Sequence, residues 1–256
     1  MSWLKALCIA FSLYSRIPVP VFKWEDRELR LHLVFFPWIG AVIGGVLFGW
    51  LKLTQALNIG PIAYVLIGAA IPLIITGGFH ADGYMDCCDA FRSYKDREEK
   101  LKILKDPHIG AFAVIMLAVI LLIYGAAFSQ IKAAFLPVFA GCFFLARTLS
   151  ALAVLFFPTA KKEGMLYSFS RTANGEKRGL VVALTFVNLG LCLTFMFIMD
   201  FRAALAAMIA AGLSFLYYCY KSKKEFGGIT GDTAGFFVCI CETAAAVAIA
   251  VCSFIF

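Results

Sequence analysis

Long apolar stretches separated by short polar loops run through almost the whole chain. Seven of them are long and apolar enough to cross a bilayer as helices. They cover approximately Leu33–Leu51, Pro61–Thr76, Ile109–Phe128, Ala134–Phe157, Leu180–Met199, Ala203–Tyr220 and Ala234–Phe256. The apolar piece before Arg16 is shorter and is interrupted by Lys5, which favours a helix lying in the membrane interface. The pattern therefore predicts an all-α integral membrane protein with about seven transmembrane helices and an N-terminal interfacial helix.

The composition agrees with a membrane protein and with no soluble class. The 256 residues are 62% hydrophobic and 15% charged, and their mean hydropathy is +0.88. Ordinary globular domains are about half apolar and about a quarter charged. No repeat, linker or second polar domain interrupts the pattern, so we interpret residues 1–256 as a single polytopic membrane domain. The N-terminal segment lacks the features of a cleaved leader, and we expect no removable signal peptide.

The basic residues are concentrated in alternate loops. Nineteen of the 23 Lys and Arg fall in the N-terminal arm and in loops 80–108, 158–179 and 221–232. Fourteen of the 16 Asp and Glu lie in the same stretches. Because loops rich in Lys and Arg stay in the cytoplasm, this bias predicts a cytoplasmic N-terminus and a cytoplasmic active-site face built from the three loops. The net charge of +7 follows from this topology, helped by anionic lipid headgroups, and needs no nucleic-acid partner.

An acidic row occupies the start of the first of these loops. Asp82, Asp86 and Asp89 follow one another at spacings of four and three residues, so on a helix they share one face. No Lys or Arg lies between them, and three neighbouring carboxylates repel one another unless a cation binds. Carboxylate oxygens suit a hard divalent ion such as Mg²⁺. A solvated acidic helix face is the structural alternative, and the spacing alone does not decide between the two.

Two glycine-rich turns accompany acidic residues at the same membrane face. Gly77-Gly78 precedes the acidic row, and Gly227-Gly228 precedes Gly231-Asp232 at the start of the last span. Glycines allow successive backbone N–H groups to form a concave nest for phosphate oxygens. Asp232 could add a further metal ligand. A loop that enters a helix also favours Gly and Asp, so the pattern has an ordinary structural explanation as well.

The end of loop 80–108 combines a surface helix with a predicted helix start. Asp96–Lys105 has the pattern of an amphipathic helix on the membrane surface. Asp106 followed by Pro107 is a typical N-cap and first-turn pair and predicts that the third span begins there. This explains Asp106 structurally. The free N–H groups at such a helix start, beside Lys105, would also suit an anion.

Three further ionisable residues stand out against apolar surroundings. Arg147 and Glu242 lie within predicted spans, where an unpaired charge is costly. They either face a polar cavity or form an ion pair with each other. Arg16 lies at the interface, where it either contacts substrate or extends to the headgroups. The nine cysteines show neither the spacing of a zinc site nor a disulfide framework.

Carboxylates, glycine turns and basic residues on one face favour a phosphorylated or diphosphate substrate. Phosphoryl transfer demands little covalent chemistry from a protein. It needs mainly positioning and charge neutralisation, which a divalent ion and cationic side chains supply. The residues therefore predict an enzyme that works on phosphate groups at the membrane surface.

Several stretches together resemble one known family. TGGFHADGYMDCCDAF at 76–91 resembles the GGxHxDGxxDxxD signature of adenosylcobinamide-GDP ribazoletransferases, also called cobalamin synthases or cobalamin-5′-phosphate synthases. Other stretches resemble the family in the same order: SRIPVP at 15–20, FFPWIG at 35–40, LKDPHIGAF at 104–112, KEG at 162–164 and GGITGDTAG at 227–235, with Glu242 beyond them. The resemblance covers essentially the whole chain. Each motif alone is weak, but six in register are specific.

The resemblance implies a Mg²⁺-dependent integral membrane enzyme of the last steps of cobalamin biosynthesis. Such an enzyme joins adenosylcobinamide-GDP to α-ribazole or its 5′-phosphate and releases GMP, through attack of the ribazole 3′-hydroxyl on the cobinamide-side phosphorus. We expect it in the cytoplasmic membrane of a bacterium or archaeon, with its active site facing the cytoplasm. Its expected partners are these small substrates and membrane lipid, with a homo-oligomer possible.

The resemblance also assigns roles to residues. The metal ligands would be Asp82, Asp86, Asp89 and Asp106. Asp82, His80 and Asp232 would act in catalysis. His80 would contact phosphate or assist proton transfer, or would be structural, and Asp232 would complete the metal site or orient the nucleophile. From residue chemistry, we expect substrate phosphates to contact Gly77, Gly78, Lys105, Gly227, Gly228, Gly231, Arg16 and Arg147.

The chain departs from the family pattern at a few positions. Cys87-Cys88 and Ala90 differ from the expected residues, and Pro107-His108 replaces a more usual Ser-Arg, which argues against a phosphate contact there.

Two other functions are alternatives to this family. A CDP-alcohol phosphotransferase also uses an Asp row, but its DGxxAR and GxxxDxxxD patterns are missing here. A membrane cation transporter would place acidic groups near mid-span, whereas these cluster at one boundary.

Overall fold

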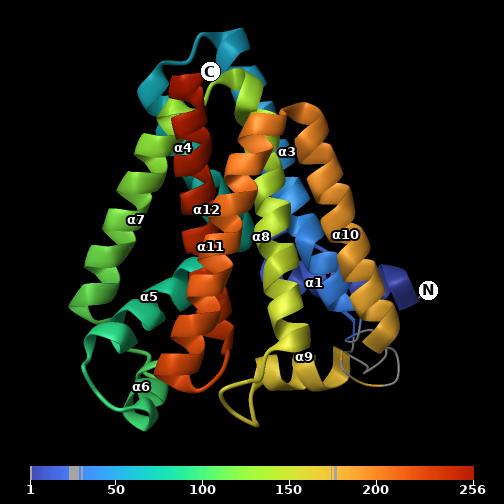
Figure 1. The fold of residues 1–256 in the computed structure, drawn as a ribbon, viewed down its shortest axis with the longest axis vertical. Helices are drawn as coiled ribbons and strands as arrows, with labels where there is room; N and C mark the ends of the chain where they lie inside the picture. Colours follow the sequence, from blue (N-terminus) through green and yellow to red (C-terminus); the bar gives the residue numbers. More distant parts are fainter. Residues whose placement is uncertain (1, 23–28, 30, 174, 176–177) are drawn as a thin grey trace.

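A bundle of α-helices makes up the computed structural model, which describes residues 2–22, 29, 31–173, 175 and 178–256 (Figure 1). Six of the described helices are long and apolar enough to cross a membrane. They are α3 (His32–Leu57), α7 (Ala111–Gln130), α8 (Leu136–Phe156, after a 3-10 turn at Ala133–Phe135), α10 (Arg178–Met199), α11 (Phe201–Phe226) and α12 (Gly231–Ile255). The described residues contain no strand beyond one isolated bridge. The predicted all-α membrane fold is confirmed.

The remaining predicted span is broken at a glycine pair. Helix α4 (Pro61–Thr76) has the predicted bounds, but it is followed by α5 (Phe79–Arg92) at an angle of 94°. Sixteen residues of helix rise only about 24 Å, less than the roughly 30 Å hydrocarbon core. Counting the bent pair as one span gives up to seven spans in the described part of the chain, as predicted.

Three shorter helices complete the charged end and its surroundings. Helix α1 (Ser2–Tyr14) is apolar but shorter than a membrane span, and it packs against α3 with Ala6, Ile9 and Ala10 buried. Helices α6 (Arg97–Ile103) and α9 (Met165–Ala173) lie at the end of the bundle opposite the C-terminus (Figure 1). Asp96 caps α6 by accepting the Glu99 N–H at 2.9 Å, so the predicted surface helix exists and ends slightly earlier than expected.

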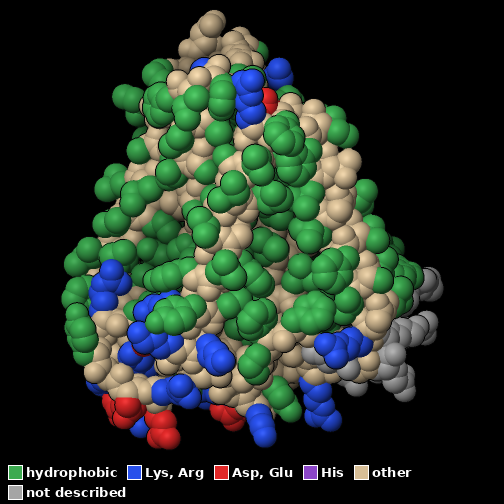
Figure 2. All heavy atoms as spheres, in the orientation of Figure 1, with side chains coloured by type: hydrophobic (Ala, Val, Ile, Leu, Met, Phe, Trp, Pro, Cys, Tyr) green, Lys and Arg blue, Asp and Glu red, His purple; other side chains and the backbone are tan. Residues whose placement is uncertain are grey.

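Helix α8 lies at the centre of the bundle and is closely packed by α3. A Cβ added at Gly40 of α3 would lie 2.3 Å from the Phe143 carbonyl oxygen, and one at Gly44 would lie 2.5 Å from the Ala140 oxygen. Backbone approach at small residues is the usual way in which membrane helices gain packing energy, because lipid supplies no hydrophobic drive between them. The face of the molecule seen in Figure 2 is largely apolar over the height of the bundle.

Charged side chains gather at one end of the molecule. In Figure 2, Lys, Arg, Asp and Glu crowd the end that carries α6 and α9, and few appear at the end where the C-terminus lies. The segregation expected from the loops is therefore visible, while the assignment of this end to the cytoplasm stays a prediction. Eight of the charged residues in these stretches lie outside the described residues: Lys23, Glu25, Asp26, Arg27, Glu28, Arg30, Glu176 and Lys177.

The prediction that Asp106 and Pro107 begin the third span is wrong. Helix α7 starts at Ala111 with Gly110 as its N-cap residue. The Asp89 carboxylate, from α5, accepts the N–H groups of Gly110 at 2.7 Å and Ala113 at 2.8 Å. A cap supplied by a distant element has thus taken the place of the local one, and it satisfies two N–H groups that the first turn of a helix leaves free.

Candidate active site

Two left-handed glycines turn the chain from α4 into α5. Gly77 has φ +66° and Gly78 has φ +79°, a region that residues with a Cβ rarely adopt. The Arg16 side chain covers Gly77, because a Cβ there would lie 2.5 Å from Arg16 Nε. The Arg16 N–H also donates to the Ile75 carbonyl at 2.8 Å. The fold therefore brings together Arg16, Gly77 and Gly78, which the sequence predicts to contact substrate phosphates.

Helices α5 and α12 cross with almost no space between their backbones. A Cβ at Gly83 would lie 2.8 Å from both the Cα and the carbonyl oxygen of Asp232, and one at Gly235 would lie 2.9 Å from the His80 oxygen. The start of α12 is fixed by a capping box, in which Thr230 accepts the Thr233 N–H at 3.1 Å. Glycine on both helices is thus what allows the α5 acidic row to lie against Asp232.

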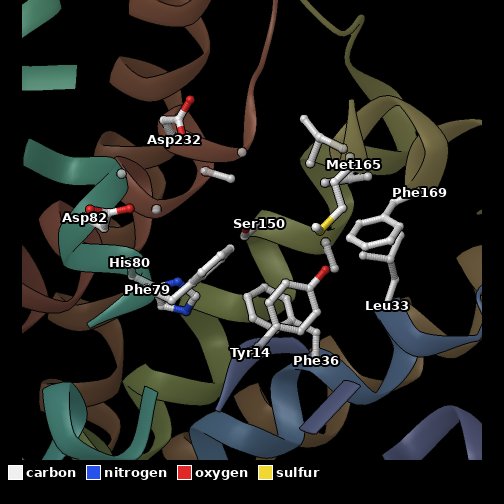
Figure 3. A pocket seen from close by; sticks show the side chains of 17 residues that line it. Tyr14, Leu33, Phe36, Phe79, His80, Asp82, Ser150, Met165, Phe169 and Asp232 are labelled. Carbon is white, nitrogen blue, oxygen red and sulfur yellow. The ribbon is translucent and has the colours of Figure 1, made fainter. Parts of the chain in front are cut away.

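A cavity of about 300 Å³ lies where α1, α3, α5, α8, α9 and the start of α12 meet. Figure 3 shows Asp82 and Asp232 at one end of it and Phe169 and Leu33 at the other. We call the part of the cavity lined by Tyr14, Phe36, Phe79 and Phe169 the aromatic chamber. The cavity therefore joins a pair of carboxylates to a large apolar wall.

The carboxylates of α5 and α12 crowd one another without a basic partner. In the described part of the chain, none of Asp82, Asp86, Asp89 and Asp232 forms an ion pair with Lys or Arg. Burial, and then the charges of Asp82, Asp232 and Asp89, raise the pKa of the Asp86 carboxyl to about 7. Such an arrangement is electrostatically unfavourable for the protein alone, and a bound cation would relieve it.

The donor set fits Mg²⁺ only if the substrate shares in binding it. Among the described residues, no three His, Cys, Asp or Glu side chains converge closely enough to hold an ion by themselves. Mg²⁺ sites commonly use one or two carboxylates, several waters and the oxygens of substrate phosphates. The hard oxygen chemistry of Asp82 and Asp86, with Asp89 occupied as the cap of α7, matches that kind of site.

Asp106 lies apart from the acidic row in this structure. Its side chain is about half exposed and accepts the His108 N–H at 3.0 Å, with His108 Nδ1 2.7 Å away. These local hydrogen bonds lower the pKa of the Asp106 carboxyl. It lines neither the cavity nor the compartment described next. The structure does not bring this predicted ligand together with Asp82 and Asp86.

A smaller basic compartment of about 120 Å³ adjoins the cavity at Gly231 and Asp232. Its lining includes Lys105, Lys161, Glu163 and Asp232, and we call this space the basic compartment. Lys105 pairs with Glu163 at 3.0 Å, and Lys161 donates to the Leu101 carbonyl at 3.1 Å. Burial, and then the neighbouring Lys105, lower the pKa of the Lys161 ammonium.

The second glycine turn holds this compartment together. Gly227 has φ +82° and ends α11, and a Cβ at Gly228 would lie 2.6 Å from the Pro158 oxygen. The backbones are joined there, since the Ile229 N–H donates to Pro158 and the Ala160 N–H donates to Ile229, both at 2.9 Å. Gly227 and Gly228 thus position the loop that carries Lys161, whereas Gly231 lines both spaces.

Arg147 and Glu242 form the ion pair that was the structural alternative for them. Arg147 Nη1 lies 2.6 Å from Glu242 Oε1 and also donates to the Phe143 carbonyl at 2.9 Å. Arg147 is only 1% exposed and does not line the cavity. In this structure Arg147 therefore holds α8 against α12, and its predicted phosphate contact remains a prediction.

His80 lines the cavity, and so do residues that the sequence did not single out. The His80 side chain is 6% exposed, and within the described residues neither of its ring nitrogens has a hydrogen-bond partner. Tyr14, Ser150, Met165 and Phe169 line the cavity, and Lys161 lines the basic compartment, but none of them was a candidate. A partial signal existed, because Phe36 lies in the FFPWIG stretch and Lys161 directly precedes the KEG stretch.

Fold and site together define a polytopic helical membrane protein whose charged end opens into a carboxylate-lined cavity. A family model described as cobalamin-5-phosphate synthase matches residues 6–250, and the chain belongs to this family of cobalamin-synthesis enzymes. It is 40% identical to an adenosylcobinamide-GDP ribazoletransferase of Lachnoclostridium phytofermentans, over 98% of this chain and 95% of that one. It is 33% identical to the enzyme of the same name from Clostridium botulinum, over 93% and 94%. No solved structure matches.

Proposed function

We propose that the protein is a Mg²⁺-dependent transferase that joins adenosylcobinamide-GDP to α-ribazole or its 5′-phosphate and releases GMP. The observation that carries the proposal is the position of Asp82 and Asp232, at the end of the cavity where Asp232 also borders the basic compartment. A diphosphate beside these carboxylates would have cations on one side and room for the second substrate on the other. The names of the curated relatives support the choice of substrates.

Asp82 and Asp86 would hold the Mg²⁺ together with oxygens of the substrate diphosphate. When bound, the ion would neutralise phosphate charge and polarise the phosphorus under attack. Without it, the same carboxylates would repel the diphosphate. The crowding that raises the pKa of the Asp86 carboxyl supports this assignment, because neighbouring carboxylates repel one another and a bound cation would remove that repulsion.

The basic compartment would bind phosphate oxygens. Lys105 and Lys161 contribute positive charge, and Gly231 begins α12, so free N–H groups of the first turn lie beside the same space. Helix N-termini of this kind attract anions. Lys161 is the stronger candidate of the two lysines, since Lys105 is already paired with Glu163 and is well exposed.

The chain's own groups would do the positioning and the proton transfer. The ribazole 3′-hydroxyl attacks the phosphorus on the cobinamide side of the diphosphate, the bond to the GMP oxygen breaks, and GMP leaves with the bonding electrons. Asp232, which borders both spaces, orients this hydroxyl and accepts its proton. His80 lines the same cavity and would contact the nucleoside that carries this hydroxyl.

A reconstitution with defined substrates tests the function. Purified protein in lipid nanodiscs is given adenosylcobinamide-GDP, α-ribazole 5′-phosphate and Mg²⁺, and GMP and the joined corrinoid are quantified by mass spectrometry. We expect equal amounts of the two products, loss of both with a chelator, and recovery when Mg²⁺ is returned. Absence of product here, combined with turnover of CDP-diacylglycerol and an alcohol, would contradict the proposal in favour of a CDP-alcohol phosphotransferase.

We also propose that the charged end faces the cytoplasm. Cysteines introduced at two exposed serines test this with a membrane-impermeant maleimide on intact cells. Ser168 lies on α9 at the charged end and Ser129 lies near the end of α7 at the opposite end. We expect labelling of S129C only. Labelling of S168C from outside would reverse the orientation.

A further inference from the structure

The cavity extends well beyond the groups that phosphoryl transfer requires. One part of it, the aromatic chamber, contains neither Lys nor Arg and no glycine turn. A diphosphate and a metal ion would gain nothing from such a wall, because charged groups are costly to move away from water. The chamber therefore needs an occupant of a different chemical kind.

The chamber walls are held in place by their own contacts. The ring of Tyr14 lies 4.3 Å from that of Phe36 at an angle of 40°, and 6.0 Å from that of Phe79 at 70°. The Tyr14 hydroxyl lies 3.2 Å from His32 Nε2, and the ring of His32 packs on Phe169 at 4.3 Å. Tilted and edge-to-face rings at these distances are favourable arrangements. The chamber is thus preformed, and its occupant would not have to organise it.

Polar atoms on the wall favour a heterocycle over a hydrocarbon chain. His80 lines the cavity with both ring nitrogens unpartnered among the described residues, and Ser150, 2% exposed, lines it as well. The rings of Phe79 and His80 lie 5.5 Å apart on the same side of the cavity (Figure 3). Buried polar groups in proteins are nearly always hydrogen-bonded. A flat ring that carries nitrogen atoms offers such partners, whereas a lipid acyl chain offers none.

The volume limits how much of a ligand can lie inside the cavity. About 300 Å³ is at the small end of ligand pockets. A protein cavity of roughly 150 Å³ holds benzene, so this one has room for a bicyclic ring and part of a sugar. A corrin macrocycle is far larger than either. The bulky substrate must therefore stay outside, and only the smaller one can enter.

We propose that the aromatic chamber binds the heterocyclic base of the nucleoside substrate and selects it by size. The inference rests on the proposed function and adds where the acceptor lies. With its base stacked among Tyr14, Phe36 and Phe169, the nucleoside places its sugar at the end of the cavity that holds Asp82 and Asp232. Affinity for the acceptor then comes from apolar burial, and the corrinoid reaches the carboxylates from the charged end.

Two chamber substitutions of opposite effect test the proposal in the full-length enzyme. Val154, on α8, also lines the cavity, so Val154→Phe reduces the volume of the cavity, and Phe169→Ala enlarges the aromatic chamber. We expect V154F to raise the KM for α-ribazole 5′-phosphate about tenfold and to leave the KM for adenosylcobinamide-GDP within about twofold. F169A should raise kcat/KM for a nucleoside with a bulkier base about tenfold relative to the natural one. Matched controls on the lipid-facing side of α10, Val187→Phe and Phe186→Ala, should change neither value.

Wild-type protein gives a second measurement that does not depend on how the variants fold. Benzimidazole, a flat bicyclic base, should inhibit competitively toward the nucleoside and not toward adenosylcobinamide-GDP, and imidazole should be much weaker. Folded variants with wild-type nucleoside KM and base preference would overturn the proposal, as would benzimidazole competing with the corrinoid or a phospholipid found in the chamber. If wild-type protein makes no GMP at all, the proposed function fails instead.

Discussion

Asp82 and Asp89 lie two turns apart on the same face of α5, yet the structure gives them different surroundings. Asp82 lines the cavity beside Asp232. Asp89 has both carboxylate oxygens occupied by the N–H groups of Gly110 and Ala113. In the sequence the two look equivalent, with the same residue type at helical spacing. The role of each carboxylate therefore depends on the groups that other helices place beside it. Helix α12 places Asp232 beside Asp82, and the start of α7 places two N–H groups at Asp89.

Substitution at the cavity end should have the largest effect. Asp82→Asn keeps the size of the side chain and removes the charge that would hold Mg²⁺. We expect turnover to fall at least about a thousandfold at every Mg²⁺ concentration, while the melting temperature changes little. GMP release measured across a Mg²⁺ series checks this. Recovery of the wild-type rate at high Mg²⁺ would leave Asp82 as a minor contributor to binding.

The contact that brings α12 to Asp82 should matter nearly as much. A Cβ at Gly83 would lie 2.8 Å from the Asp232 backbone, so Gly83→Ala must push α5 and α12 apart. Because small misplacements of reacting groups are costly, we expect about a hundredfold loss in kcat with the protein still folded. Gly190→Ala, on α10 with open space around it, is the matched control and should leave turnover unchanged. A normal rate in G83A would show that the close crossing is not needed for catalysis.

Much of this arrangement could be predicted from the chain, and the part that could not is non-local. The spans were predictable because an apolar helix satisfies its own backbone hydrogen bonds in lipid. The acidic row was predictable from its helical period. The partner of Asp89 lies 21 residues further on, and the cavity is assembled from six helices, so no local pattern reports either. The mistaken N-cap at Asp106 has the same cause, since a distant carboxylate replaced the local one.

Asp86 lies between Asp82 and Asp89 on α5, and its substitution should combine a moderate loss of activity with a gain in stability. Asp86→Asn removes one of the two carboxylates that would hold Mg²⁺, but Asp82, the substrate oxygens and the new amide oxygen remain to bind the ion, so we expect turnover to fall about tenfold at low Mg²⁺ and to recover in part as Mg²⁺ is raised. The pKa of the Asp86 carboxyl is higher in the folded protein than in the unfolded chain, so ionisation of this group destabilises the fold. Without Mg²⁺, the wild type should therefore lose stability as the pH rises from about 4 to 7. Melting temperatures in chelator should show this decline in wild type and a weaker one in D86N. Identical profiles would remove Asp86 from the repulsive cluster.

Asp89 should give the smallest change in rate and a clear change in stability. Asp89→Ala leaves the N–H groups of Gly110 and Ala113 without their acceptor, which costs about 1–2 kcal/mol, or a few degrees in melting temperature. Below that temperature we expect turnover within about threefold of wild type, because the cap acts on α7 and not on the substrate. Asp89→Asn keeps one acceptor oxygen and should lose about half as much stability. If instead D89N melts like the wild type but is as inactive as D82N, Asp89 is a metal ligand after all, and the two ends of the row have the same role.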